Sequence, residues 1–306
     1  MKKILLLFSE TSIHKSHNPE ELARQLTDSA NSRDHEARFD VAMYEDLMYV
    51  IQPEGGKIVH SVTGEDIASY NLVYQRRWED KQDQSLACAI YLKHKGVPFV
   101  DSESYNNSSK NKLTQAWRFW EAGLPHPKTV CFGSTQAQQR LLDNLESLPL
   151  DFPLIAKELN GFGGNNNYLV HTVEELSAVF LKNPDMRFIL QEYIPNKGDY
   201  RVIVYGDRVG LAIKRVAAEG MHTNNSSQGG RGELVAVDDV PANILDDSVK
   251  AATLLGREVA GVDVVVHEKT GKHYFFEVNR CPQIETGLFV KEKADTLADY
   301  LYSEAQ

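Results

Sequence analysis

The chain has 306 residues, 42% of them hydrophobic, which is enough for roughly two or three packed units. Its formal net charge of −10 argues against a general nucleic-acid binder and against a protein that binds anionic membranes. The cysteines Cys88, Cys131 and Cys281 show no CxxC spacing. They therefore argue against a disulfide framework and indicate a reducing compartment, which we expect to be the cytoplasm.

Residues 1–108 predict a mostly parallel α/β domain. Strands are expected at 4–8, 39–43, 72–75 and 97–100, with helices at 19–30 and 82–94. Helices that alternate with strands in this way are typical of a parallel sheet. The segment Gln75-Arg76-Arg77-Trp78 ends one of these strands, and ligands gather at such ends in open α/β sheets. A surface Arg pair beside a packed Trp is an equal alternative.

Residues 109–185 predict a smaller second unit. An amphipathic helix is expected at 110–121, with Trp117 and Trp120 on its apolar side, and another helix at 134–147. The strand at 154–158 carries Lys157 and leads into the turn NGFGGNNN. Glycines let backbone N–H groups approach an anion closely, so the turn and Lys157 together favour a phosphate site. A plain hairpin turn is the alternative, and the absence of a following helix argues against a P-loop.

Residues 186–306 predict a larger, β-rich unit. Strands are expected at 188–194, 202–205 and 211–216, followed by a long Asn-, Ser- and Gly-rich loop. A helix at 247–260 then leads into GVDVVV, and a turn connects this strand to HYFFEVN at 273–279. The last two segments predict a β-hairpin. The C-terminus is expected to form a short polar helix.

Three oxygen-bearing side chains meet on this predicted hairpin. Glu277 and Asn279 are two residues apart and leave the same face of the strand, and the hairpin brings Asp263 beside Glu277. Carboxylate and amide oxygens of this kind suit Mg²⁺. The strand alone gives equal weight to another interpretation, in which Glu277 and Asn279 lie on the solvent face of an edge strand.

Taken in chain order, these features resemble the ATP-grasp superfamily. The segments that carry the resemblance are ILQEYI, GDYRVIVYGDRVGLAIKR, NNSSQGGRGE, GVDVVV and FFEVNRCP, and they lie between Lys110 and Gly287. The branch most similar to them holds RimK-type glutamate ligases and bacterial glutathione synthetase. The resemblance implies an α/β plus α+β chain, with an N-terminal α/β domain at 1–108 and a two-lobed ATP-grasp fold built on antiparallel sheets at 109–185 and 186–306.

The resemblance also implies roles for single residues. Lys112 and Lys157 match the lysines that hold the nucleotide phosphates, and Gly161, Gly163 and Gly164 match the loop that closes over the transferred phosphoryl group. Gln191, Glu192, Tyr193 and Ile194 match the hinge beside adenine, largely through backbone groups, and Asp199 matches an acid near the ribose. Asp263, Glu277 and Asn279 match the magnesium ligands. Arg215 and Asn225 match positions near the γ-phosphate and the acyl phosphate, and Arg280 and Arg231 add guanidinium groups suited to carboxylates and phosphates.

The activity implied by the resemblance is ATP-dependent ligation of a carboxylate to an amine. The carboxylate attacks the γ-phosphate to give an acyl phosphate, and the amine then displaces phosphate to form an amide on an amino acid, a peptide or a protein tail. The expected cofactors are ATP and Mg²⁺, with Mn²⁺ as a substitute, and a homo-oligomer remains open. Two alternatives are a kinase of the same fold that transfers phosphate to a hydroxyl and a nucleotide-binding regulator without turnover.

Overall fold

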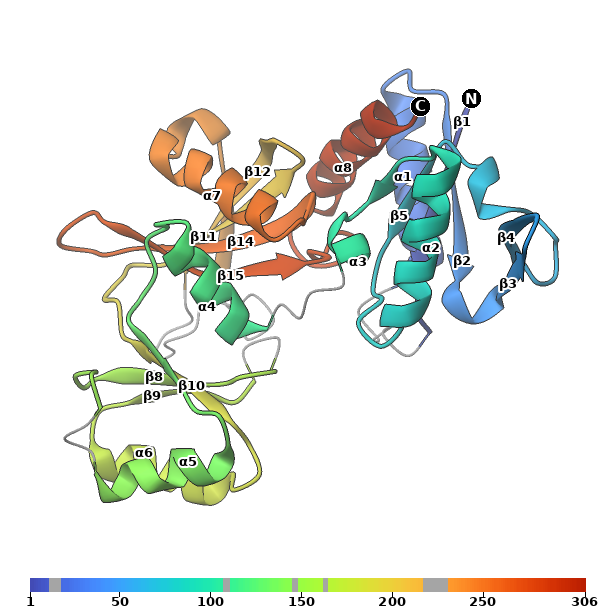
Figure 1. The fold of residues 1–306 in the computed structure, drawn as a ribbon. Helices are drawn as coiled ribbons and strands as arrows, with labels where there is room; N and C mark the ends of the chain where they lie inside the picture. The colour runs from blue at the N-terminus through green and yellow to red at the C-terminus, as the bar shows by residue number, and fades with distance from the viewer. Residues whose placement is uncertain (11–17, 107–110, 145–147, 162–164, 217–230) are drawn as a thin grey trace.

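The computed structural model describes residues 1–10, 18–106, 111–144, 148–161, 165–216 and 231–306. Its sheets form an N-terminal domain, a large lobe and a small lobe, and the small lobe lies below the large one in Figure 1. The N-terminal sheet is parallel and the sheets of the two lobes are antiparallel, as the sequence predicts.

The N-terminal domain is built on a sheet of order β2-β1-β5-β6. Its strands are β1 (Lys2–Phe8), β2 (Ala37–Met43), β5 (Leu72–Gln75) and β6 (Phe99–Val100), and its helices are α1 (Pro19–Ser32), α2 (Gln82–Lys95) and α3 (Glu103–Asn106). Leu6 packs with α1 and Leu7 packs with α2, so the two helices cover opposite faces of β1. The hairpin formed by β3 (Leu47–Gln52) and β4 (Gly55–His60) was not expected from the sequence.

The small lobe has a sheet of order β7-β10-β8-β9 covered by two helices (Figure 1). Its elements are β7 (Thr129–Cys131), α5 (Thr135–Arg140), β8 (Leu154–Glu158), β9 (Asn167–Val170), α6 (Val173–Lys182) and β10 (Phe188–Glu192). Because β10 is an inner strand, this sheet continues to residue 192, past the boundary expected at 185. Helix α5 is shorter than expected and passes into a 3₁₀ turn at Leu141–Asp143, and α6, capped by Thr172, was not expected.

The large lobe has a sheet of order β13-β12-β11-β14-β15. Its elements are β11 (Asp199–Tyr205), β12 (Arg208–Val216), β13 (Arg231–Val235), α7 (Ala242–Leu254), β14 (Val259–Val266), β15 (His273–Arg280) and α8 (Val290–Glu304). The expected β14–β15 hairpin is confirmed. The helix expected at 247–260 is wrong by about one and a half turns at each end, because Pro241 precedes its first turn and Gly256 adopts a left-handed φ of 65° just after it.

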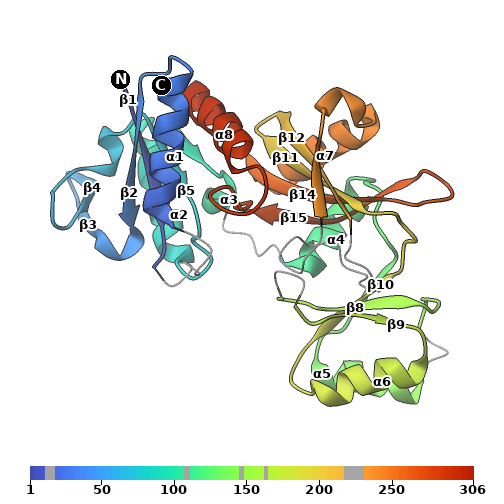
Figure 2. The ribbon, with the colours of Figure 1, turned by 180° about the vertical axis from the view of Figure 1, so that it is seen from behind.

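Helix α4 (Lys112–Glu121) precedes the small lobe in sequence but packs against the large one (Figure 2). Phe119 contacts Phe275 on β15, with ring centroids 6.2 Å apart, and Gln115 is also buried. The side of this helix that carries Trp117 and Trp120 is solvent-exposed, since these residues are 61% and 65% accessible. The expectation that both tryptophans lie on the apolar side is therefore wrong.

Helix α8 ties the large lobe to the N-terminal domain. It lies beside α1 in both views (Figures 1 and 2), and Ser29 of α1 donates a hydrogen bond to Asp295 of α8 at 2.6 Å. Leu297 and Leu301 are fully buried in a core that includes residues of β1 and of β11 and β12, so this helix is not the short polar one expected. Across the described ranges, no helix is long and apolar enough to span a bilayer.

Candidate active site

The centre of the candidate site is one face of the β14–β15 hairpin. Asp263 pairs directly with Glu277, and a bulge at this point changes the register so that Val264 pairs with Phe275. Asn279 pairs with Gly261, and its Nδ2 donates to Gly261 O at 3.2 Å and to Asp263 Oδ2 at 3.0 Å. The amide nitrogen is thus engaged within the protein, which leaves Asn279 Oδ1 as the atom able to bind a cation.

Two arginines, from strands β11 and β12, converge on Asp263. Arg215 of β12 donates to Asp263 Oδ1 at 2.7 Å and to both carboxylate oxygens of Asp199, at 2.8 and 2.6 Å. The Nε atom of Arg201 on β11 lies 2.8 Å from Asp263 Oδ1, and its Nη2 atom donates a hydrogen bond to Asp263 Oδ2 at 3.2 Å. Arg201 was not among the residues expected at the site, although the Asp-Tyr-Arg triplet on β11 places it on the face that carries Asp199.

Burial and charge act against each other in this cluster. Burial disfavours the charge on Arg215, but the Asp263 and Asp199 carboxylates outweigh it and raise the pKa of this arginine. Burial also raises the pKa of Asp199, and the neighbouring Arg215 opposes that shift. Burial lowers the pKa of Arg201 in spite of Asp263. The cluster therefore holds fixed cationic groups in a partly dry site, where they stabilise added negative charge strongly.

The oxygen donors of this face fit a divalent cation of the hard type. Asp263, Glu277 and Asn279 offer two carboxylates and one amide oxygen, which are the ligand types that Mg²⁺ prefers. Asp263 already accepts from both arginines, whereas the Glu277 carboxylate accepts no hydrogen bond from any described residue. A cation at this face would therefore find its least committed ligand in Glu277.

The small lobe contributes Lys157 from β8. Lys157 Nζ donates to Gln191 Oε1 at 2.9 Å and lies 4.3 Å from the ring centroid of Phe276, the bulged residue of β15. Burial lowers the pKa of Lys157 to about 8, while the Glu277 carboxylate opposes the shift and the Lys112 ammonium adds to it. Lys112, the first residue of α4, donates to the carbonyl of Gly161. Lys157 thus contacts the large lobe through Phe276, and Lys112 contacts the small lobe through Gly161.

The remaining predicted nucleotide contacts lie where the chain leaves β10. Glu192 ends that strand, and its backbone N–H donates a hydrogen bond to the Lys128 carbonyl oxygen at 2.9 Å. Ile194 is buried, and its carbonyl accepts from Asn196 Nδ2 at 2.8 Å. Tyr193 lies between them and is half-buried. Gly163, Gly164 and Asn225 lie outside the described residues, and Arg231 is exposed at the start of β13.

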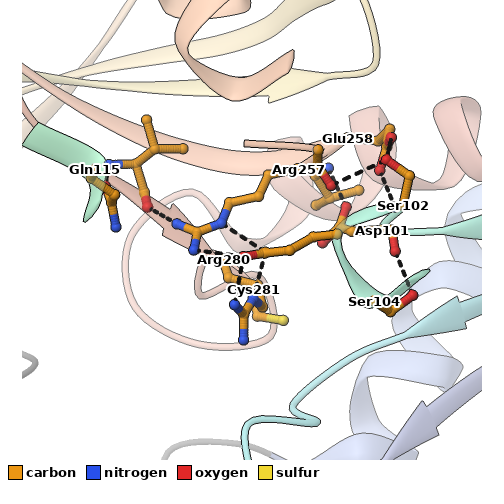
Figure 3. A network of polar contacts seen from close by, with 12 residues as sticks. Asp101, Ser102, Ser104, Gln115, Arg257, Glu258, Arg280 and Cys281 are labelled. Atoms are coloured by element: carbon orange, nitrogen blue, oxygen red, sulfur yellow. Dashed lines mark hydrogen bonds and ion pairs between the residues drawn. The ribbon is translucent and has the colours of Figure 1, made fainter. Parts of the chain in front are cut away.

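Arg280 does not join the cluster around Asp263. Its Nε and Nη2 donate to the two oxygens of Glu103 at 2.8 and 2.7 Å, and its guanidinium stacks 4.1 Å from the Trp78 ring centroid. Arg257 donates to the same carboxylate at 2.8 and 3.0 Å. Figure 3 shows Arg257 and Arg280 close together in this network. Arg280 leaves β15 on the face opposite to Asn279 because adjacent residues of a strand alternate. It therefore holds the N-terminal domain against the end of the β14–β15 hairpin.

Comparison with known proteins identifies the family. A sequence profile described as the RimK-like ATP-grasp domain matches residues 109–298. The chain belongs to the RimK-like ATP-grasp family. Relatives of this RimK-like protein include β-citrylglutamate synthase B of Mus musculus, 24% identical over 86% of this chain and 67% of that protein. A probable α-L-glutamate ligase of Syntrophotalea carbinolica is 26% identical over 88% of this chain and 87% of that protein.

Solved structures show the same fold. The ATP-grasp ligase PsnB complexed with minimal precursor superposes with a TM-score of 0.67 at 19% identity, over 100% of this chain and 99% of that one. The macrocyclase MdnC from Microcystis aeruginosa, bound with precursor peptide MdnA, gives a TM-score of 0.61 at 14% identity, over 99% and 100% of the two chains. The RimK-like chain is thus an ATP-grasp ligase that forms carbon–nitrogen bonds, which implies ATP, a divalent metal ion, a carboxylate and an amine.

Proposed function

We propose that this RimK-like ligase activates a carboxylate as its acyl phosphate and transfers it to the amine of an amino acid, a peptide or a protein tail. The observation that supports the proposal best is the cross-strand pair Asp263–Glu277, with Asn279 on the same face and Arg215 bonded to Asp263. Phosphoryl transfer needs oxygen ligands for a metal beside fixed cations that stabilise the transferred oxyanions.

Each side chain has a definite part in the proposed reaction. Asp263, Glu277 and Asn279 would hold Mg²⁺, which when bound neutralises charge on the β- and γ-phosphates. Lys157 and Lys112 bind phosphate oxygens from the small-lobe side and from α4. Arg215 and Arg201 offer guanidinium groups to the γ-phosphate and to the acyl phosphate. Asp199 keeps Arg215 in place through its bidentate contact and therefore acts on the chemistry indirectly.

Glutamate is the amine substrate that we propose to test first. Two groups of relatives are named for glutamate, as citrylglutamate synthase and as α-L-glutamate ligase. The solved neighbours PsnB and MdnC are complexed with precursor peptides, so peptides are the second class to test. Cys88, Cys131 and Cys281 are free thiols, which supports our proposal that the protein works in a reducing compartment such as the cytoplasm.

A hydroxylamine trap tests the proposed function directly. The protein is incubated with ATP, Mg²⁺ and a panel of carboxylates that includes citrate and glutamate, and hydroxylamine replaces the amine. A ligase forms hydroxamate and ADP in equal amounts, because hydroxylamine captures the acyl phosphate. Stoichiometric ADP with a phosphorylated alcohol and no hydroxamate would support the kinase instead. ATP binding without ADP release under any pair of substrates would support a regulator.

A further inference from the structure

We propose that Gln191 and Thr129 are positioning residues that aim Lys157 at the nucleotide phosphates, and that Gln191 does this as a neutral acceptor. The inference rests on the proposed phosphate role of Lys157. It differs from the role that the resemblance implies for Gln191, which is to line the adenine pocket.

The three side chains form a row on one face of the small sheet. Thr129 of β7 pairs directly with Gln191 of β10. Lys157 of β8 pairs with Ile189, two residues before Gln191, so that Lys157 and Gln191 are diagonal neighbours on the same face. Gln191 is only 5% exposed. The row begins at the edge strand of the sheet and ends at Lys157, which faces Phe276 of the large lobe.

The hydrogen bonds of the row can run in one direction only. The Thr129 hydroxyl donates its single proton to the carbonyl of Pro127 at 2.8 Å. Its oxygen therefore accepts from Gln191 Nε2, which lies 3.2 Å away. This contact orients the amide so that Oε1 faces Lys157 Nζ at 2.9 Å. An ammonium group can only donate, so both ends of the row require the same orientation of the Gln191 amide.

The neutral character of Gln191 preserves the charge that a phosphate site needs. Among the described residues, Lys157 Nζ contacts an amide oxygen and the face of an aromatic ring, and neither cancels its positive charge. Because the amide takes one of the three ammonium protons, two remain for phosphate oxygens. A carboxylate at position 191 would hold Nζ in the same place but would form an ion pair and weaken its attraction for ATP.

The same contacts argue against a role for the Gln191 side chain in binding adenine. Its oxygen and one N–H are already used by Lys157 and Thr129. The amide oxygen has a second lone pair, but a base that took the place of Lys157 on this oxygen would leave the buried ammonium without its hydrogen-bond acceptor, which is costly in a dry site.

Four variants and three ligands test the hydrogen-bonded row Thr129–Gln191–Lys157, which we call the relay. The dissociation constants of ATP, ADP and adenosine are measured by calorimetry for Thr129→Val, Thr129→Ser, Gln191→Glu and Lys157→Ala, each checked for folding by thermal denaturation. Thr129→Val keeps the shape and removes the hydroxyl, so ATP and ADP should bind about two- to tenfold more weakly, the range expected for one hydrogen bond. Thr129→Ser keeps the hydroxyl and should restore wild-type affinity. Gln191→Glu should also weaken ATP and ADP, and adenosine should bind all folded variants equally.

The outcomes separate this inference from the proposed function. If Lys157→Ala leaves ATP affinity unchanged, the phosphate role of Lys157 is wrong and the relay falls with it. If Lys157→Ala weakens ATP while Thr129→Val and Gln191→Glu do not, only the relay is wrong. An equal loss of adenosine affinity in the Thr129 or Gln191 variants would overturn the relay in favour of an adenine contact. Failure of Thr129→Ser to restore affinity would also overturn it.

Discussion

The junction between the N-terminal domain and the β14–β15 hairpin gives the sharpest prediction on stability. Glu103 is fully buried, and both of its carboxylate oxygens accept hydrogen bonds from Arg257 and from Arg280. We expect Glu103→Gln to destabilise the protein, because two guanidinium groups would then face one neutral amide whose NH₂ group cannot accept. The backbone around this junction is held in other ways, since Glu103 N–H also donates to Gly256 O at 2.8 Å.

The size of the effect follows from the pKa of Glu103. Burial alone would raise this pKa, but the hydrogen bonds from Arg280 and Arg257 outweigh it and lower the value from 4.5 to about 2. Lowering the pKa from 4.5 to about 2 corresponds to a stabilisation of about 3 kcal/mol. Breaking a buried ion pair by removing one partner costs about 3–5 kcal/mol of stability, which agrees with the value obtained from the pKa.

The pH dependence of the effect has a fixed sign. A carboxyl group whose pKa is lowered on folding contributes its full stabilisation above the unfolded value of 4.5, and this is lost as the pH falls towards 2. The difference in unfolding free energy between wild type and Glu103→Gln should therefore be about 3 kcal/mol at pH 7 and should shrink below pH 4.5.

Urea unfolding followed by tryptophan fluorescence measures this difference, because Trp78 is buried against Arg280 at the junction. Glu121→Gln is the matched control, since Glu121 pairs with Arg118 at 2.9 Å on an exposed helix face and should contribute at most about 1 kcal/mol. An unfolding free energy of Glu103→Gln within about 0.5 kcal/mol of the wild-type value at pH 7 would refute the prediction, because the buried ion pair is expected to contribute several times that amount. So would a difference that stays constant from pH 7 to pH 3.

Two further predictions concern the face that we propose to be catalytic. Glu277→Gln should lower turnover by orders of magnitude, because the loss of this proposed metal ligand removes several kcal/mol of transition-state stabilisation. The urea midpoint should stay near that of wild type, and an unstable variant would make Glu277 a structural residue. Gly261→Ala would place a Cβ 2.7 Å from Arg201 Nη1 and 3.2 Å from Pro282 Cβ, so it should displace the guanidinium from Asp263 and reduce hydroxamate formation at least about tenfold through the lost charge-assisted bonds. Gly133→Ala, which adds its Cβ in open space, should have wild-type turnover, and equal effects of the two alanines would contradict this role of Arg201.

Several features of the site were predictable from the sequence because they depend on local periodicity. A strand repeats every two residues, so HYFFEVN by itself places Glu277 and Asn279 on one face. The short connection at residues 267–272 between two apolar segments predicts the hairpin that pairs Glu277 with Asp263. Lys157 before a glycine-rich turn predicts a cation at the same end of β8. These relations involve neighbours in the chain, and the fold preserves them.

Other features were decided only by tertiary packing. The spacing of apolar residues in α4 allows either face of the helix to pack inward. The contact of Phe119 with Phe275 on β15 buries one face, and Trp117 on the other face is exposed. Arg280 was expected beside the phosphates, but Glu103, 177 residues earlier in the chain, binds it on the opposite face of β15. The partner of a charged side chain depends on which distant segment of the chain folds next to it, and no local pattern of residue types specifies that segment.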